Sequence, residues 1–376
     1  MSLLFADDDN SFMIKRLTPI DIFALGFMTF ALFLGAGNVI FPPGAGLAAG
    51  ANIWPTAFGF LITAVGLPLL TLIALARVGG GLAQLTAPLG GAAGVTLSVL
   101  VYLAIGPLFA TPRTTVVSYE IGVLPFVSDS WQTLLGYSLI YFAAVIFLAL
   151  KPGQLMDRVG KYITPVLLAG LVLLGLAALF LPAGDMQAAS GQYRDAPMIQ
   201  GFLQGYLTMD TLGALVYGIV ITTAIRDRQV NSAPLITRYT VMAAVIAATG
   251  LSLVYLSLFY LGSTSGSLVE PGVNGGQILA AYVQYRFGTA GSALLALVII
   301  LACMTTAVGL LTACGEYFSK LLPLSYSAVV WLFGLFSMLV ANQGLDSLIS
   351  VSIPVLVGLY PLAIVLVCIS LLGASW

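Results

Sequence analysis

Histidine is absent from the sequence, and charged residues and cysteines are scarce. Of the 376 residues, 7% are Asp, Glu, Lys or Arg, whereas an ordinary soluble domain is about 25% charged. Without histidine, Ser-His-Asp and Cys-His catalysis, HExxH zinc sites and histidine proton relays are excluded. The three cysteines, Cys303, Cys314 and Cys368, lie in apolar stretches without CxxC spacing. This pattern favours buried apolar side chains over a disulfide framework or a metal site.

The charge balance also excludes classes of partner. The formal net charge is −1, and there is no run of basic residues, so binding to nucleic acid has no electrostatic basis. Nothing indicates an obligatory protein partner. The hydrophobic share is 60% of 376 residues, which is enough for roughly ten membrane spans of about 20 residues each. The composition therefore predicts an all-α integral membrane protein, with the lipid bilayer as its surroundings.

Apolar runs bounded by glycine, proline and charge predict ten spans. They cover residues 20–41, 54–76, 92–121, 132–150, 160–181, 201–225, 236–262, 289–318, 326–341 and 346–373. The segment 271–287 is predicted to be an extramembrane helical hairpin. Residues 1–18, which include Asp7, Asp8 and Asp9, are predicted to be a cytoplasmic tail that is not a cleaved signal peptide.

Basic residues predict the orientation of these spans. With the N-terminus in the cytoplasm, the inner loops would hold Lys15, Arg16, Arg77, Lys151, Arg158, Lys161, Arg226, Arg228, Arg238 and Lys320, and the outer loops only Arg194 and Arg286. Cytoplasmic loops of membrane proteins carry such an excess of Lys and Arg. Arg113 belongs to neither group, because it falls within the third apolar run.

Two spans carry residues that disfavour a continuous helix. The first has Gly35, Gly37 and Asn38 at mid-span, and the sixth has Thr208-Met209-Asp210-Thr211. Within a bilayer, such breaks are tolerated where the backbone lines a cavity. Two other interpretations remain open: a small-residue packing groove in the first span, and an aspartate that caps a kink in the sixth.

The positions of these two spans indicate an internal repeat. Each begins a group of five, at residues 19–181 and 182–376, and because five is odd the second group enters from the opposite side of the membrane. Two halves that each open with an interrupted helix are typical of inverted-repeat transporters with a midplane binding site. The predicted fold is therefore a five-plus-five inverted repeat with discontinuous helices 1 and 6.

The eighth span offers neutral oxygen ligands for a cation. Ala302, Thr305 and Thr306 share one helix face. Facing the broken first span, they form a candidate Na⁺ site together with the carbonyls of Ala31 and Leu34. The alternative is that both threonines bond only to their own helix. No other cofactor is predicted.

The two breaks suit a free amino acid. Exposed N–H groups from Ala36 to Asn38 would bind its carboxylate, and unwound carbonyls from Tyr206 to Asp210 would bind its ammonium. Too few polar side chains lie nearby to recognise a sugar. The candidate substrate-binding residues are Gly35, Ala36, Gly37, Asn38, Tyr102, Tyr206, Thr208, Asp210, Thr211 and Gly213.

Arg113 and Glu120 form a further candidate pair. They lie seven residues apart, two turns along one helix face, next to Pro112, which bends the helix. We expect this pair to act as a gate or a support.

Several motifs resemble those of one transporter family. Residues 24–33, 35–38, 41–43, 78–81, 106–113, 205–213 and 323–326 are similar to those of the bacterial branched-chain amino acid:cation symporters, the BrnQ family. The resemblance implies a LeuT-type fold, import of leucine, isoleucine and valine with a coupling cation, and a place in the bacterial inner membrane. It places Asn38 beside the substrate carboxylate or a first ion. It also assigns Ala31, Leu34, Ala302, Thr305 and Thr306 to a second ion site.

Members of this family carry about twelve spans, whereas this chain ends after the tenth predicted span. By this resemblance peripheral spans eleven and twelve are missing, and two explanations remain open: the sequence is a piece of a longer chain, or the natural chain is short. Rival functions are a proton-coupled carrier, with Asp210 and Glu120 as buried acids, and an amino acid sensor that binds without transport. An enzyme is not expected, because neither histidine nor a catalytic carboxylate pair is present.

Overall fold

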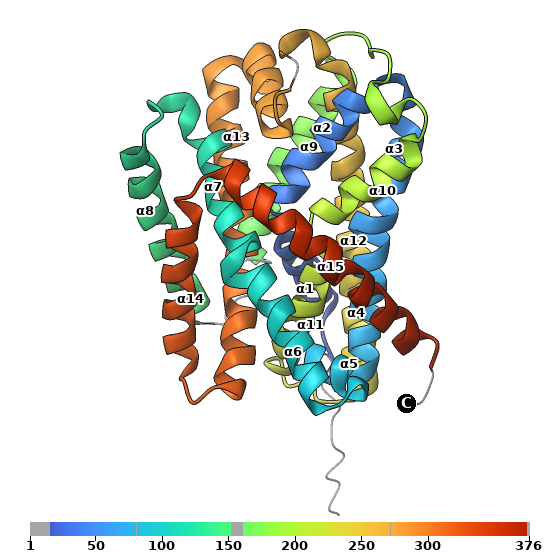
Figure 1. Ribbon diagram of the computed structural model, residues 1–376, viewed down its shortest axis with the longest axis vertical. Coiled ribbons are helices and arrows are strands. Elements are labelled where there is room, and N and C mark those ends of the chain that lie inside the picture. The colour runs from blue at the N-terminus through green and yellow to red at the C-terminus, as the bar shows by residue number, and fades with distance from the viewer. Residues whose placement is uncertain (1–15, 80, 152–160, 271, 374–376) are drawn as a thin grey trace, which may run out of the picture.

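The computed structural model describes residues 16–79, 81–151, 161–270 and 272–373, and this part of the chain is a bundle of helices without a β-strand (Figure 1). A chain in hydrocarbon must satisfy its backbone hydrogen bonds internally, and helices do so within each segment. The all-α prediction is confirmed. Residues 1–15 of the predicted tail, and Arg158 of the predicted inner loops, lie outside the described residues.

The first five spans occupy the N-terminal half of the chain. They are α1 (Pro19–Phe33) with α2 (Ala36–Ala49), α3 (Ile53–Leu61) with α4 (Leu67–Val78), α6 (Gly91–Leu103) with α7 (Ala110–Gly122), α8 (Trp131–Ala149) and α9 (Thr164–Phe180). Two π-helical turns, Ile62–Gly66 and Ala104–Leu108, join the halves of the second and third spans. The short helix α5 (Leu82–Thr86) lies between these two spans.

The second half repeats this arrangement. It comprises α10 (Pro197–Leu207) with α11 (Asp210–Arg226), α12 (Ala233–Thr264), α13 (Gly275–Leu321), α14 (Tyr326–Ala341) and α15 (Leu345–Leu371). Short 3-10 turns connect the spans at Gly50–Asn52, Ala87–Leu89, Leu124–Phe126, Gly191–Tyr193 and Gly266–Leu268.

Length and hydropathy support ten crossings in the described residues. Seven helical runs are long and apolar enough to span a membrane, or eight with α10 and α11 as one bent span. One of these runs, Ala36–Val78, has 43 residues, about twice the length that a bilayer core of about 30 Å requires. It turns at Gly50, where φ is +47°, and so contains the end of the first span and all of the second. The shorter apolar helix α14 is the remaining crossing.

Helix contacts show the inverted relation of the two halves. The start of span one, α1, packs on span seven (α12), and the start of span six, α10, packs on span two (α3). The second parts of spans one and six show the same relation, because α2 packs on α12 and α11 packs on α4. Span five (α9) contacts α12, just as span ten (α15) contacts α4. Each contact in one half thus has its counterpart in the other, as an inverted repeat requires.

Two local predictions are corrected. The segment 271–287 is not a helical hairpin, because its residues from Gly275 onward form a single helix. This helix is the first part of α13, which bends at Gly288. Gly288 has φ +59° and ψ −156°, a conformation that is accessible to glycine. Cys368 is exposed on the bundle surface, whereas Cys303 and Cys314 are buried as expected.

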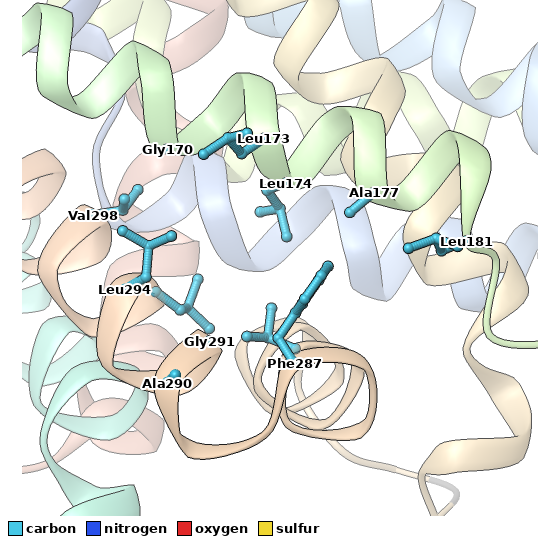
Figure 2. Close-up of a pocket in the computed structure, with 12 residues that line it drawn as sticks. Gly170, Leu173, Leu174, Ala177, Leu181, Phe287, Ala290, Gly291, Leu294 and Val298 are labelled. Carbon is cyan, nitrogen blue, oxygen red and sulfur yellow. The ribbon is translucent and has the colours of Figure 1, made fainter.

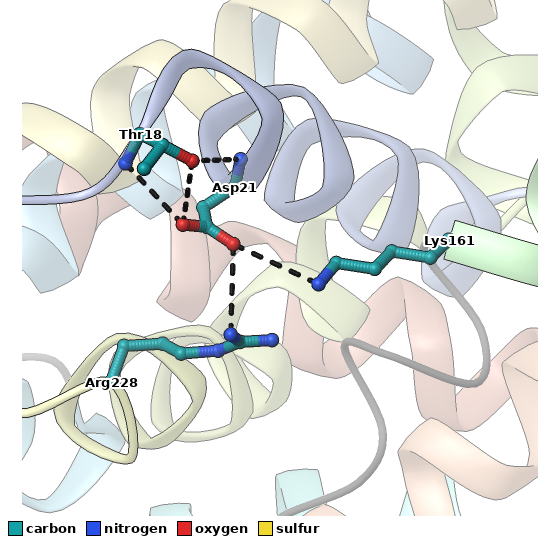
Figure 3. A network of polar contacts seen from close by, with 4 residues as sticks. All are labelled: Thr18, Asp21, Lys161 and Arg228. Carbon is teal, nitrogen blue, oxygen red and sulfur yellow. Dashed lines mark hydrogen bonds and ion pairs between the residues drawn. The ribbon is translucent and has the colours of Figure 1, made fainter.

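The charged residues separate toward the two ends of the bundle. At the start of α1, Asp21 accepts a hydrogen bond from Thr18 Oγ1 at 2.7 Å and forms ion pairs with Lys161 at 3.8 Å and Arg228 at 3.6 Å (Figure 3). At the end of α2, the chain meets the loop that carries Arg194, through the bond from Ala51 N to Gln187 O. Lys161 and Arg228 therefore lie at the end of span one opposite to Arg194.

Replacing Asp21 is expected to weaken the bundle slightly. Asp21→Asn removes both ion pairs but keeps a side chain that can cap α1. Because the ion-pair partners are partly exposed, the loss should be about 1 kcal/mol, or about 2 °C in the unfolding midpoint of the detergent-solubilised protein. The decrease should shrink in about 1 M salt, which screens the pairs. Asp185→Asn, in an exposed loop, is the control. An equal decrease at low and high salt would contradict the electrostatic origin.

Candidate functional site

The two predicted helix breaks are present. Between α1 and α2, Leu34 and Gly35 leave the helical conformation, with ψ 78° and −163°. Between α10 and α11, Met209 has a left-handed conformation with φ +68°, and the two helices are bent by 40°. A positive φ is uncommon for a residue with a side chain. Both spans are therefore interrupted as the sequence predicted.

The glycines of the first break allow close approach. A Cβ atom on Gly37 would lie 2.8 Å from Nη2 of Arg113 and 3.0 Å from Cα of Thr208. A Cβ atom on Gly35 would lie 2.9 Å from Cγ2 of Thr306. These distances are shorter than carbon and nitrogen atoms tolerate without a shift of the neighbour. The small residues thus bring the third, sixth and eighth spans against the broken first span.

A hydrogen-bond network joins the two breaks. The Asn38 side chain accepts a bond from Gly35 N at 3.2 Å and donates to Asp210 Oδ2 at 2.6 Å. Tyr255 of α12 donates to the same carboxylate oxygen at 3.0 Å and also contacts the Asn38 amide. Thr208 Oγ1 accepts from Asp210 N at 3.4 Å. The aspartate is therefore partnered from outside its own helix, which favours a site over a simple kink cap.

Arg113 reaches the second break from the third span. Its guanidinium donates to the carbonyls of Leu207, at 3.1 Å, and Thr208, at 3.4 Å. It also stands 5.6 Å above the ring of Phe41. Glu120, two turns along α7, is partly buried. The hydrogen bonds of Arg113 thus run to the backbone at the break in span six, and a gate or support role for Arg113 and Glu120 stays a prediction.

A cavity of about 30 Å³ lies where these elements meet. Its lining includes the polar side chains of Asn38, Arg113 and Asp210, and the largely apolar ones of Phe33, Ile105, Tyr217 and Leu310. Seven of the predicted substrate-binding residues line it: Gly35, Ala36, Gly37, Asn38, Thr208, Asp210 and Gly213. The structure therefore gathers most of the predicted set at one place.

Three predicted residues lie elsewhere. Tyr102 stacks on Tyr317, with ring centroids 4.1 Å apart, beside a separate cavity of about 250 Å³ that Lys320 also lines. Tyr206 packs on Tyr360, with centroids 4.5 Å apart. Thr211 donates to the carbonyl of Thr63 at 3.3 Å. Conversely, Tyr255 had no sequence signal, because a tyrosine in an apolar run resembles a packing residue.

The oxygen atoms of the candidate ion site also lie close together. Thr305 Oγ1 lies 3.0 Å from Ala31 O and 2.9 Å from Ala302 O. Thr306 Oγ1 lies 3.3 Å from Ala31 O and 2.9 Å from Leu32 O. Both hydroxyls therefore contact the first span rather than only their own helix. The Leu32 carbonyl joins the predicted set, whereas the Leu34 carbonyl makes none of these contacts.

A larger cavity differs in its lining. About 500 Å³ in volume, it lies between α9 and the first half of α13 (Figure 2). All its lining residues are glycine, alanine, valine, leucine or phenylalanine. An amino acid head group would find no charged partner there. The small central cavity, which joins both helix breaks, is therefore the candidate site.

Ten crossings in two inverted halves, with both broken helices meeting at a buried polar cavity, define a multi-pass transporter of the LeuT type. The family profile described as "Branched-chain amino acid transport protein" matches residues 18–376. The chain belongs to this family, which confirms the resemblance seen in its motifs.

Named relatives agree with this assignment. The chain is 66% identical over 361 residues to the branched-chain amino acid transport system 2 carrier protein of Pseudomonas aeruginosa, covering 96% of this chain and 83% of that protein. It is 55% identical over 364 residues to the branched-chain amino acid permease BrnQ of Escherichia coli K12, covering 97% and 83%. Both relatives are named as transport proteins rather than as enzymes.

Solved structures support the fold. MhsT in complex with L-phenylalanine superposes with a TM-score of 0.61 at 16% identity, covering 96% of this chain and 90% of that one. A substrate-bound Na⁺-coupled sialic acid symporter superposes with a TM-score of 0.59, also at 16% identity, covering 91% and 78%. At this identity the likeness shows a shared fold.

Proposed function

We propose that the chain is a secondary active symporter that imports leucine, isoleucine and valine together with Na⁺ by alternating access. The observation that carries this proposal is the central cavity at the junction of both broken helices, which is lined by charged and by apolar side chains. An aliphatic amino acid combines the same two kinds of group, two charges and a hydrocarbon side chain. No cofactor beyond the coupling ion is needed.

The size of the cavity supports alternating access. At about 30 Å³ it has room for about two water molecules. Leucine has nine non-hydrogen atoms and requires the surrounding helices to move apart. The breaks in spans one and six supply flexible points at the cavity itself, where the two halves can rock against each other.

The oxygen set of spans one and eight supports Na⁺ as the coupling ion. Two hydroxyls and the carbonyls of Ala31, Leu32 and Ala302 approach one another within hydrogen-bond distance. These are hard, neutral ligands, which suit a monovalent cation that must bind and leave. In the described residues, no cluster of three or more His, Cys, Asp or Glu could hold a more tightly bound metal.

The charge distribution supports the proposed setting. Lys161 and Arg228 lie with Asp21 at the start of span one, in agreement with a cytoplasmic N-terminus in a bacterial inner membrane. We assign residues 19–181 and 182–376 to the two repeats. The proposed partners are the amino acid substrate and the lipid bilayer.

The driving force is sufficient for accumulation. A potential of about −100 mV supplies about 2.3 kcal/mol for each positive charge. A tenfold Na⁺ gradient adds about 1.4 kcal/mol. One coupled ion could therefore drive roughly 500-fold accumulation of a neutral amino acid.

Uptake by proteoliposomes tests the proposal. The purified full chain should accumulate radiolabelled leucine when Na⁺ is high outside, and replacing Na⁺ by choline should reduce the initial rate at least about tenfold. A pH gradient alone should give no accumulation. Equal uptake without Na⁺ would contradict the ion assignment, and uptake driven by the pH gradient would select a proton-coupled carrier. Binding without counterflow would indicate a sensor.

A further inference from the structure

We infer that Arg113 and Asp210 form a charge pair that recognises the zwitterionic head group of the substrate, with Arg113 binding its carboxylate and Asp210 its ammonium. This inference rests on the proposed function, since it assigns the chemistry of the same cavity. It assigns Arg113 to direct substrate contact rather than to a gate or support. For the substrate ammonium it names the Asp210 side chain, where the sequence suggested backbone carbonyls.

The two side chains are buried charges that line one small cavity. Arg113 is 4% exposed and Asp210 is 5% exposed, and both border the central cavity. They attract each other electrostatically, but form no direct ion pair within the described parts of the chain. Unpaired charges inside a membrane are costly, so they mark ligand pathways. A ligand that carries both opposite charges would compensate both residues at once.

Arg113 retains donors for an anion. Its bonds to the carbonyls of Leu207 and Thr208 use two of the five N–H groups of a guanidinium. Its Nε atom is buried without a hydrogen-bond partner, which is rare for a buried donor. A guanidinium edge is suited to binding a carboxylate through two parallel bonds. The nearby N–H groups of the second half of span one, from Ala36 to Asn38, border the same cavity and would assist.

Asp210 retains an acceptor for a cation. The side-chain hydrogen bonds from Asn38 and Tyr255 end on Oδ2, and the Thr208 side chain also bonds to the carboxylate. These bonds hold the carboxylate beside the cavity, and its two oxygens together offer about four lone-pair sites, which leaves acceptor capacity. An ammonium group donates three hydrogen bonds and suits such an oxygen. Tyr255, together with Asn38, therefore acts as a positioning residue for the ammonium partner.

The geometry of the cavity selects an amino acid rather than a simple amine or acid. A ligand with only one charge would leave either Arg113 or Asp210 buried without its partner, and sites built for a polar group reject analogues that lack it. The apolar lining residues, among them Phe33, Ile105 and Leu310, would contact the aliphatic side chain. Charge pairing thus determines the substrate class, and the apolar lining determines which amino acids fit.

Competition against radiolabelled leucine tests this directly on the purified full chain. The probes are 4-methylpentanoate, which is leucine without its ammonium, and 3-methylbutylamine, which is leucine without its carboxylate. Wild-type protein should bind each at least about 100-fold more weakly than leucine. If either probe binds within about tenfold of leucine, the inference is wrong, whereas absence of leucine binding to wild-type protein would defeat the proposed function itself.

Two variants test which residue binds the ammonium of the ligand and which binds its carboxylate. Asp210→Asn should reduce the discrimination between leucine and 4-methylpentanoate to about tenfold or less, and Arg113→Gln should do the same for 3-methylbutylamine. Glu316→Gln, a carboxylate that accepts from Thr223 outside the cavity, is the control and should preserve both ratios. A uniform loss of affinity for all ligands in Asp210→Asn would show a merely structural role. A changed Na⁺ dependence with an unchanged ratio would assign Asp210 to the ion, and either result would overturn the inference.

Discussion

Asn38→Ala is expected to lower the initial rate of Na⁺-driven leucine uptake about 100-fold, because it removes a bond to a buried carboxylate, a loss of about 3 kcal/mol. The Asn38 amide connects three elements: Gly35 N in the first break, Asp210 in the second, and Tyr255 of α12. Alanine would leave Asp210 without the Asn38 bond and with Tyr255 and Thr208 as its side-chain donors. Radiolabelled leucine uptake by proteoliposomes that contain equal amounts of protein measures the effect.

Asn52→Ala provides the matched control for this prediction. Asn52 lies in the turn after α2, at the opposite end of that helix from the first break, and its amide donates to the carbonyl of Tyr193 at 3.0 Å. Its substitution should change uptake less than twofold. The unfolding midpoint in detergent separates a defect of the site from a loss of fold. If Asn38→Ala transports leucine at the wild-type rate with the same Na⁺ dependence, the proposed site is misplaced.

The double substitution Thr305→Ala/Thr306→Ala is expected to raise the Na⁺ concentration for half-maximal uptake at least about 30-fold, because two ion ligands at about 1 to 1.5 kcal/mol each are lost. Both hydroxyls approach carbonyls of the first span. Thr306 also borders the central cavity, but the hydroxyls of both threonines contact carbonyls of the first span, so the preference among leucine, isoleucine and valine should persist. Uptake as a function of external Na⁺, at saturating leucine, measures the shift.

Thr222→Ala is the control for the ion site. Thr222 is equally buried, but its hydroxyl donates to Gly218 O at 2.9 Å on its own helix, so its removal should leave the Na⁺ dependence unchanged. An altered amino acid preference with a normal Na⁺ dependence in the double variant would assign the threonines to the substrate instead. An unchanged Na⁺ dependence alone would remove them from the ion site.

Much of the fold could be predicted from residue chemistry alone. A chain with 7% charged and 60% hydrophobic residues must be surrounded by lipid, and in lipid only internally bonded segments are stable. Gly35, Gly37 and the run from Thr208 to Thr211 compete locally with helical hydrogen bonds, so both breaks were visible before any packing was known. Each break opens a group of five spans, and because five is odd the second group had to enter from the opposite side, as in an inverted repeat.

The predictions that missed the cavity concern contacts between helices. Tyr102 and Tyr206 are among the predicted substrate-binding residues, yet Tyr102 stacks on Tyr317 and Tyr206 packs on Tyr360. An aromatic side chain is equally suited to a pocket or to packing, and the choice depends on which neighbouring helix faces it. The third span leaves helical geometry at Gly106. This bend likewise depends on tertiary packing, and it determines how α6 and α7 approach the cavity.

The sequence by itself determined the solvent of this protein, its helical class, its repeat and the location of its two helix breaks, because these follow from composition, spacing and local backbone preference. Only the tertiary structure decided that Tyr255 supports Asp210 and that Arg113 turns toward the unwound backbone of span six. Both contacts join residues on different helices, more than forty positions apart. A buried charge in the sequence indicates that a partner is needed, but the packing of the helices determines which residue that partner is.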